Sequence, residues 1–211
     1  LDTYELERKP HAWAMIRMAR RIGAYMQPKS RAGAALSQGM LRLFCLIPAA
    51  RDYILHLKFK PRPRFTEGLL ASWPIASAPI PPGQLMTQPA LIDEDGRSQL
   101  LDEALGSGFA LITWAGAAGQ SGTAEGVSIP EDFPVALKTV QLIRAEDDFL
   151  PGLRGSGLLR DAHGEIARVL DGARARAAVL RPDRHVLGYV GDSVREDWAQ
   201  LRTALTAFYT R

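Results

Sequence analysis

The 211-residue sequence is short of the residues on which several kinds of chemistry depend. It holds a single cysteine, Cys45, so it can form neither an internal disulfide nor a dithiol redox pair. Its four histidines lie far apart, with no cysteine pair beside them and without the spacing of a metal site. No glycine-rich loop stands between a strand and a helix, as a dinucleotide fingerprint requires. We therefore predict no catalytic, cofactor-binding or metal-binding residue in this stretch.

Long apolar runs are also missing. Arginine or proline interrupts every stretch that approaches the roughly 20 residues of a membrane helix. The opening LDTYELERKPHAWAM carries carboxylates where a signal peptide has a basic start and an apolar block. Together with the single cysteine, this predicts a cytoplasmic protein that does not contact a membrane. Because the chain begins with Leu1 rather than Met, we expect it to be part of a longer polypeptide.

Acidic residues are scarce in the first part of the chain. The net charge is +3, yet residues 1–64 hold 13 Lys and Arg against 4 Asp and Glu, while the remainder holds 13 against 19. A basic half is compatible with nucleic acid, or with an acidic neighbouring domain. The arginines are spread singly along predicted helices without interleaved exposed aromatic residues, so we expect no nucleic-acid partner.

The amino-terminal part has the apolar spacing of helices. Helices are predicted over residues 2–26, about 31–46 and from Pro48 through Lys58. A capping-box pattern of Asp2 and Glu5 opens the first helix, although Pro10 interrupts it. Cys45 stands among apolar residues, so we expect it to be buried. Residues 1–71 form the predicted helical segment, and the proline-rich residues 72–90 are predicted to be a connector.

Residues 91–211 have the pattern of an α/β domain. Apolar runs predict strands over 108–114 and 135–143, a hairpin of 175–180 and 185–190 around Arg181-Pro182-Asp183-Arg184, and a final amphipathic helix from Ser193. Asp93-Glu94-Asp95-Gly96 is predicted to be a solvated hairpin turn. The order of strand, connection, strand, short helix, hairpin and helix matches a thioredoxin-like layout.

The residues after the first strand allow two interpretations. Trp114-Ala115-Gly116-Ala117-Ala118-Gly119-Gln120-Ser121 resembles the thioredoxin active-site segment, in which a tryptophan lies four positions before Cys-Gly-x-Cys. Ala118 and Ser121 occupy the two cysteine positions, so this domain has no CxxC and disulfide exchange is excluded. The other interpretation, a plain loop after a strand, stays open.

Four segments resemble class A FAD-dependent aromatic-ring monooxygenases, which include 3-(3-hydroxyphenyl)propionate hydroxylases and phenol hydroxylase relatives. Tyr4, Glu7, Arg8 and Ala12 resemble the Tyr-x-x-Glu-Arg-x-x-x-Ala pattern of the helix that closes their flavin domain. RDYILHLKFKPRPRF (51–65) and QPALIDEDGRSQLLDEALGSGFALI (88–112) are similar to later stretches. AAVLRPDRHVLGYV (177–190) resembles their LVRPDGxVAW hairpin, with Arg184 where glycine is usual.

The resemblance implies that the chain is the carboxyl-terminal, non-catalytic part of such an enzyme, with a structural and dimerisation role. The parent would use FAD and NAD(P)H to hydroxylate phenolic aromatic compounds, while this stretch by itself would bind no cofactor and be inactive. Its implied partners are the flavin domain of the parent and a second copy in a homodimer. The alternative is a free-standing, redox-inactive thioredoxin-like module for protein interaction.

Overall fold

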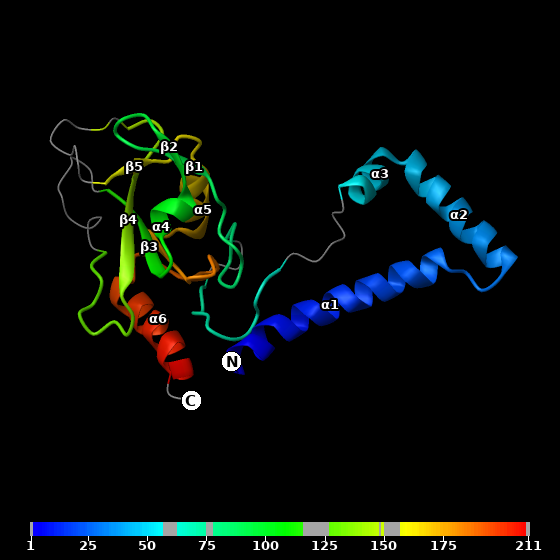
Figure 1. Ribbon diagram of the computed structural model, residues 1–211, viewed down its shortest axis with the longest axis horizontal. Helices are drawn as coiled ribbons and strands as arrows, with labels where there is room; N and C mark the ends of the chain where they lie inside the picture. Colours follow the sequence, from blue (N-terminus) through cyan, green and yellow to red (C-terminus); the bar gives the residue numbers. More distant parts are fainter. Residues whose placement is uncertain are drawn as a thin grey trace. The chain divides into compact units, whose positions relative to one another are not determined.

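The computed structural model describes residues 2–56, 63–74, 78–115, 127–147, 149 and 157–209 (Figure 1). The chain divides into two compact units, Leu1–Arg64 and Phe65–Arg211. The first unit holds the predicted helices and the second holds the predicted α/β domain.

The described part of the first unit contains three helices: α1 (Asp2–Met26), α2 (Arg31–Leu46) and α3 (Pro48–Leu55). The sequence predicted all three. Ser30 begins α2 as its N-cap, since its hydroxyl accepts a hydrogen bond of 3.1 Å from the backbone N–H of Gly33. Pro48 stands in the first turn of α3, where a helix needs no N–H from it.

Cys45 corrects one prediction, because its side chain is exposed rather than buried. The apolar neighbours along α2 are themselves exposed, and neither α2 nor α3 buries a residue. An apolar stretch of sequence indicates a surface that is stable only when something covers it. Within the described residues nothing covers this one.

The described residues of the second unit form a seven-stranded sheet in the order β2-β1-β5-β4-β3-β6-β7. Its strands are β1 (Ala90–Ile92), β2 (Ser98–Leu100), β3 (Phe109–Trp114), β4 (Leu137–Ile143), β5 (Leu159–Arg160), β6 (Ala177–Leu180) and β7 (Val186–Val190). Strand β4 runs parallel to both β3 and β5, while the remaining neighbours are antiparallel. This arrangement confirms the α/β class and the thioredoxin-like layout.

Helices cover both faces of the sheet. Helices α4 (Leu101–Leu105) and α5 (Glu165–Ala173) bury their apolar residues in one core, and α6 (Val194–Tyr209) packs on the opposite face. On α6 the predicted apolar stripe is largely confirmed, because Trp198, Leu201 and Leu205 are buried. Val194 is half-buried, and the side chain of Phe208 lies outside the described residues.

Ala71 and two residues of the predicted connector, Gly83 and Gln84, line the free edge of β7. The backbone N–H of Gly83 donates to Val186 O at 2.8 Å, and Val186 N–H donates to Gln84 O at 3.0 Å. Ala71 N–H donates to Leu187 O at 2.8 Å. These bonds give an end strand of the sheet the partners that an open edge would lack. The division between the units accordingly falls after Arg64, and the described residues of 72–90 belong to the second unit.

Gly83 shows how tight this attachment is. Its φ is +84°, and a Cβ atom at this position would stand 2.1 Å from the carbonyl oxygen of Phe65. Any other residue would have to move the backbone away from Phe65, so glycine is required where the connector doubles back.

Candidate functional site

The carboxyl end of β3 leads into the segment that resembles a thioredoxin active site without its two cysteines. Trp114 ends the strand, but Ala118 and Ser121 lie outside the described residues. The guanidinium carbon of Arg144 lies 4.7 Å from the centroid of the Trp114 ring, within the range of a cation–π contact. The buried indole N–H of Trp114 finds no acceptor among the described residues. The structure therefore places a cation on this tryptophan, a contact that the sequence did not predict.

The charge of Arg144 is already paired within the protein. Its two terminal nitrogens donate to the two carboxylate oxygens of Asp171 at 2.9 and 2.8 Å. This hydrogen-bonded pairing with Arg144 lowers the pKa of Asp171, against a smaller opposing effect of burial. Such a fork-like pair satisfies the cation and leaves the Trp114 cluster a structural one.

Carboxylates already occupy the amino ends of the helices that border the sheet. In α5, the buried Asp161 accepts hydrogen bonds of 3.0 and 2.9 Å from the backbone N–H groups of Glu165 and Ala167. In α4, the Glu103 carboxylate accepts from Leu100 N–H at 3.1 Å. These are the N–H groups that would otherwise bind an anion.

A carboxylate also lies in the first turn of α6, where it binds the backbone of the residues that precede the helix. The carboxylate of Asp197 accepts a hydrogen bond of 2.7 Å from Gly191 N–H. Burial raises the pKa of Asp197, and the nearby charges of Glu196 and Asp192 act in the same direction. A pyrophosphate brought to any of these three helices would meet a carboxylate of like charge. The described residues therefore do not fit a dinucleotide such as FAD or NAD(P)H.

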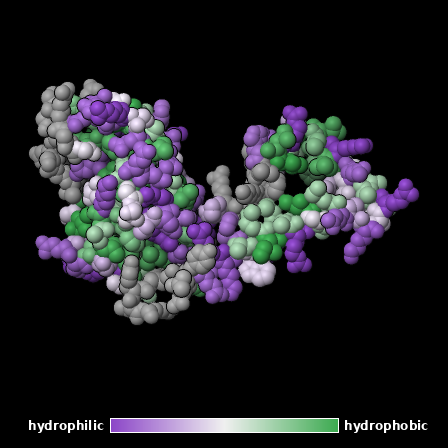
Figure 2. Space-filling view, viewed as in Figure 1, coloured by the Kyte–Doolittle hydropathy of each residue, from purple (hydrophilic) through white to green (hydrophobic). Residues whose placement is uncertain are grey.

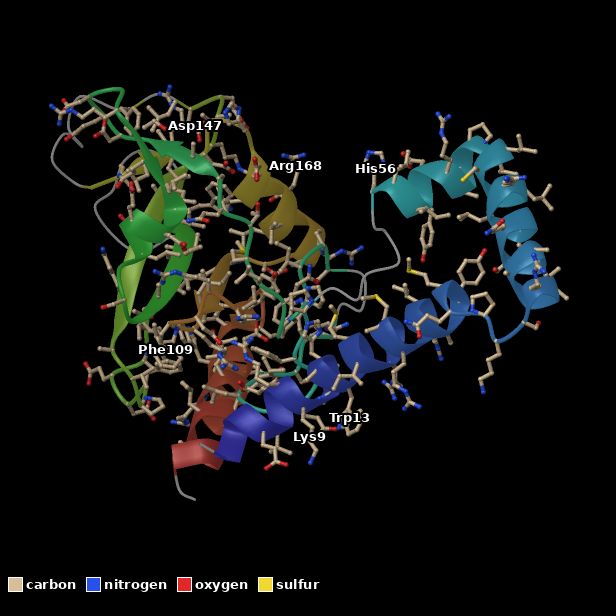
Figure 3. The ribbon with its side chains drawn as sticks, turned by 45° about the vertical axis from the view of Figure 1, so that its right-hand side comes forward. Lys9, Trp13, His56, Phe109, Asp147 and Arg168 are labelled. Atoms are coloured by element: carbon tan, nitrogen blue, oxygen red, sulfur yellow. The ribbon has the colours of Figure 1, made fainter. Side chains whose placement is uncertain are left out.

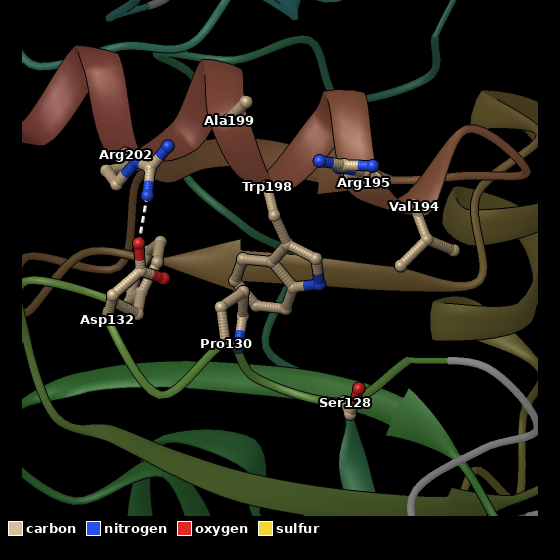
Figure 4. Close-up of a pocket in the computed structure, with 9 residues that line it drawn as sticks. Ser128, Pro130, Asp132, Val194, Arg195, Trp198, Ala199 and Arg202 are labelled. Carbon is tan, nitrogen blue, oxygen red and sulfur yellow. Dashed lines mark hydrogen bonds and ion pairs between the residues drawn. The ribbon is translucent and has the colours of Figure 1, made fainter.

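A cavity of about 540 Å³ opens beside α6 (Figure 4). Its wall is made by Ser128, Pro130, Asp132, Phe133, Val194, Arg195, Trp198, Ala199 and Arg202. Phe133 packs edge-on against Trp198 with ring centroids 5.0 Å apart, and Asp132 forms an ion pair with Arg202. Among these lining residues no histidine stands beside Ser128, so the serine has no general base to activate it.

No pattern in the sequence predicted this cavity. Asp132 and Arg202 belong to segments far apart in the chain, and no local pattern announces that they meet. The described wall provides shape and a neutralised ion pair, without the paired nucleophile and base that covalent chemistry requires.

The Arg181–His185 turn is a packing centre. His185 is 6% exposed, and its ring stacks on Phe65 with centroids 4.2 Å apart. The guanidinium of Arg181 lies 5.2 Å from the same Phe65 ring and donates to Leu69 O at 3.2 Å. Asp183 accepts from Arg181 at 3.1 Å and lies 3.4 Å from Nδ1 of His185. The turn thus holds the chain segment that enters the second unit.

Arg184 occupies the position at which the resemblance leads one to expect glycine. Its φ is +67°, in the left-handed region that favours glycine. The side chain compensates, because its Nε lies 2.7 Å from a carboxylate oxygen of Asp102 and another nitrogen donates to Gly106 O. Arginine therefore ties the turn to the end of α4 in a way that glycine could not.

No group of three or more metal-ligating side chains gathers anywhere in the described ranges. Among the same residues, no single helix is long and apolar enough to cross a membrane, and α2 with α3 meets that test only as a pair bent by 108°.

Comparison with known proteins assigns the chain a family. Residues 83–205 match the family model described as HcaD C-terminal domain. A 3-(3-hydroxy-phenyl)propionate/3-hydroxycinnamic acid hydroxylase of Mycolicibacterium smegmatis is 31% identical over 211 residues, which cover 97% of this chain and 36% of the relative. A second such hydroxylase, from Burkholderia vietnamiensis, is 34% identical over 88% of this chain and 34% of its own length. The chain thus spans about a third of the length of these curated relatives.

Two solved structures resemble nearly the whole chain. The flavin-dependent monooxygenase PieE, in complex with FAD and substrate, is 17% identical with a TM-score of 0.54, over 98% of this chain and 40% of its own. The anhydrotetracycline hydroxylase OxyS from Streptomyces rimosus is 19% identical with a TM-score of 0.52, over 96% and 34%. At this level of identity the likeness concerns the fold.

Proposed function

The chain belongs to the HcaD C-terminal domain family, and we propose that it is the non-catalytic, carboxyl-terminal part of an FAD- and NAD(P)H-dependent monooxygenase. The observation that carries this proposal is the match to hydroxylases over nearly all of the chain and only a third of their length. The parent enzyme would hydroxylate phenolic aromatic compounds in the cytoplasm.

The helix ends support the non-catalytic part of the proposal. Asp161 and Glu103 occupy the N–H groups at the amino ends of α5 and α4 that would receive cofactor phosphates, and Asp197 adds a carboxylate to the first turn of α6. Cys45 is the single thiol of the sequence, so no dithiol can cycle. Within this division of labour, the preceding domain of the parent would hold the flavin and this part would add fold and contact surface.

The first unit supports a structural and dimerisation role. Among the described residues, every exposed large apolar side chain except Leu85 and Leu100 belongs to it. Trp13 is 51% exposed and Ile16 is 48% exposed on the same helix, and Figure 3 shows Trp13 and Lys9 on α1. Apolar surface gathered in this way is typical of a surface that another domain or subunit covers. We propose both the flavin domain and a second copy as its partners.

The same surface counts against a free-standing interaction module. Helices of 16 and 8 residues gain most of their stability by packing an apolar face, and α2 and α3 bury none of their residues. A module that worked alone would need that face covered within its own chain.

A chimera tests the proposal. The part of the Mycolicibacterium smegmatis relative that matches this chain is replaced by the 211 residues, and the chain alone is purified as the control. We expect the chain alone to be colourless and to consume no NAD(P)H. We expect the chimera to retain FAD and to oxidise NAD(P)H when 3-(3-hydroxyphenyl)propionate is added. A flavin absorbance band of near-stoichiometric height in the chain alone would contradict a non-catalytic role.

A further inference from the structure

A groove in the first unit has no assigned occupant. It has a volume of about 670 Å³ and lies among the end of α1, α2 and α3. Its wall is almost wholly apolar and includes Tyr25, Met40, Leu41, Phe44, Ile47 and Tyr53. Figure 2 shows apolar side chains on the visible face of these helices.

Large apolar side chains of the groove are about half exposed. Phe44 is 49% exposed and Ile47 is 52% exposed, although both are large and apolar. Tyr25 at the rim donates its hydroxyl hydrogen to Ser37 O, which joins α1 to α2 and holds the wall in place. A preformed apolar pocket with partly exposed aromatic side chains is typical of a site that binds an apolar anchor residue of a partner.

Cations border the groove. Arg21 lies one turn before Tyr25 on the same face of α1, and Arg51 lies on the flank of α3 beside Ala50 and Ile54. Neither arginine forms an ion pair within the described parts of the chain. The first 64 residues hold 13 Lys and Arg against 4 Asp and Glu. The surface that fits is therefore apolar at its centre and acidic at its rim.

We propose that this groove seats an apolar, acid-rimmed element of the amino-terminal region that makes up the rest of a full-length family member. The inference rests on the proposed function. The match leaves nearly two thirds of the Mycolicibacterium smegmatis relative outside it, which is ample chain to supply such an element.

A second copy is a poorer occupant of the groove. In a closed dimer the same patch meets itself, so the cations around Tyr25 would face their own copies. Trp13 offers a separate surface for self-association, because it lies about 120° around α1 from Tyr25 at 3.6 residues per turn. The groove and the Trp13 face can therefore be tested independently.

Binding in trans tests the groove. The purified 211-residue chain is titrated with the amino-terminal region of the Mycolicibacterium smegmatis relative, cut where the match begins, and affinity is measured by calorimetry. We expect Phe44→Asp to raise Kd at least about tenfold, since it puts a charge into an apolar socket beside an acidic partner. Leu85→Asp is the matched control, because Leu85 is 47% exposed against 49% for Phe44 and belongs to the second unit. It should change Kd less than about twofold.

A charge-reversal variant tests the acidic rim of the partner separately. The double variant Arg21→Glu, Arg51→Glu should weaken binding strongly in about 0.05 M salt and much less in about 0.5 M salt, where screening is shorter-ranged. An equal loss at both salt concentrations would overturn the acidic rim.

Other outcomes identify other occupants. If Phe44→Asp leaves binding unchanged, or instead abolishes self-association or binding to vesicles of anionic phospholipid, the groove assignment is wrong while the proposed function stands. If the wild-type chain does not bind the amino-terminal region at all, the groove assignment is wrong, whereas the proposed function stands or falls with the chimera.

Discussion

The imidazole of His185 stacks on the phenyl ring of Phe65, with centroids 4.2 Å apart and ring planes 25° from parallel. The two residues come from opposite ends of the second unit, one from the β6–β7 turn and the other from the segment where the unit begins. Arg181 joins them from 5.2 Å, so the turn holds Phe65 between a ring and a cation. The Arg181–His185 motif thus has a structural role, since it holds the segment at Phe65 against the β6–β7 turn.

Replacing Phe65 should therefore destabilise the second unit as a core mutation does. Phe65 is 2% exposed, and Phe65→Ala should lower the free energy of unfolding by about 3–5 kcal/mol. Leu85→Ala in the same unit is the control, because Leu85 is 47% exposed and should change stability by less than about 0.5 kcal/mol. Urea titration of both variants gives the comparison. Equal changes in the free energy of unfolding would mean that the contacts of Phe65 do not stabilise the second unit.

Asp183 should make stability depend on acid pH. Burial opposes ionisation of its carboxyl group, but the hydrogen bond to His185 and the charge of Arg181 outweigh it, and the pKa is lowered from 3.8 to about 2. Because the folded pKa lies below the unfolded one, the stabilisation is present above about pH 4 and is lost as the pH falls through about 2. Asp183→Asn should cost on the order of 1 kcal/mol at pH 7, since the carboxylate is partly exposed.

The test compares urea midpoints of wild type and Asp183→Asn at neutral and acid pH. The difference between them should shrink as the pH falls from about 4 towards 2. Asp95→Asn, in the exposed turn where Asp95 lies 3.2 Å from Arg97, is the control and should show a small difference at every pH. A constant difference between wild type and Asp183→Asn would show that the ionised carboxylate is not what stabilises the turn.

Arg184 should separate backbone strain from side-chain bonding. Both Arg184→Gly and Arg184→Ala remove the ion pair with Asp102, but only alanine keeps a Cβ at a φ of +67°. We expect the alanine variant to be less stable than the glycine variant by about 1 kcal/mol. Thermal or urea unfolding measures this difference directly. Two variants of equal stability would indicate that the turn relaxes out of the left-handed region.

The exposed Trp13 face should make the chain self-associate, more strongly as salt is added. The +9 charge of residues 1–64 opposes the contact, and its reach falls from about 30 Å at 0.01 M salt to about 10 Å at 0.1 M. Burial of apolar surface gains about 25 cal/mol per Å² and is not screened. Light scattering after size exclusion should show a dimer that tightens with salt and is lost in Trp13→Asp. A strict monomer at high salt and high concentration would remove this support for dimerisation.

The sequence by itself determined the elements whose signals are local. The runs predicted over 108–114 and 135–143 became the central strands β3 and β4. In β3 the four inner residues are all buried, as expected of a strand covered on both faces. Arg181-Pro182-Asp183-Arg184 specified the turn between β6 and β7 through its own turn chemistry. The single cysteine likewise excluded dithiol chemistry without any structure.

Tertiary structure decided what distant residues do to one another. Phe65 belongs to the predicted helical segment 1–71, and no local pattern there marks it as buried. It is buried because His185 and Arg181 pack on it from the β6–β7 turn. The pairing of Arg144 with Asp171 and the occupation of the α5 amino end by Asp161 are also results of the assembled sheet. Cys45 shows the converse, since its apolar neighbours in sequence did not bury it. Periodicity records which face of an element is apolar, whereas burial depends on a partner that the local sequence does not contain.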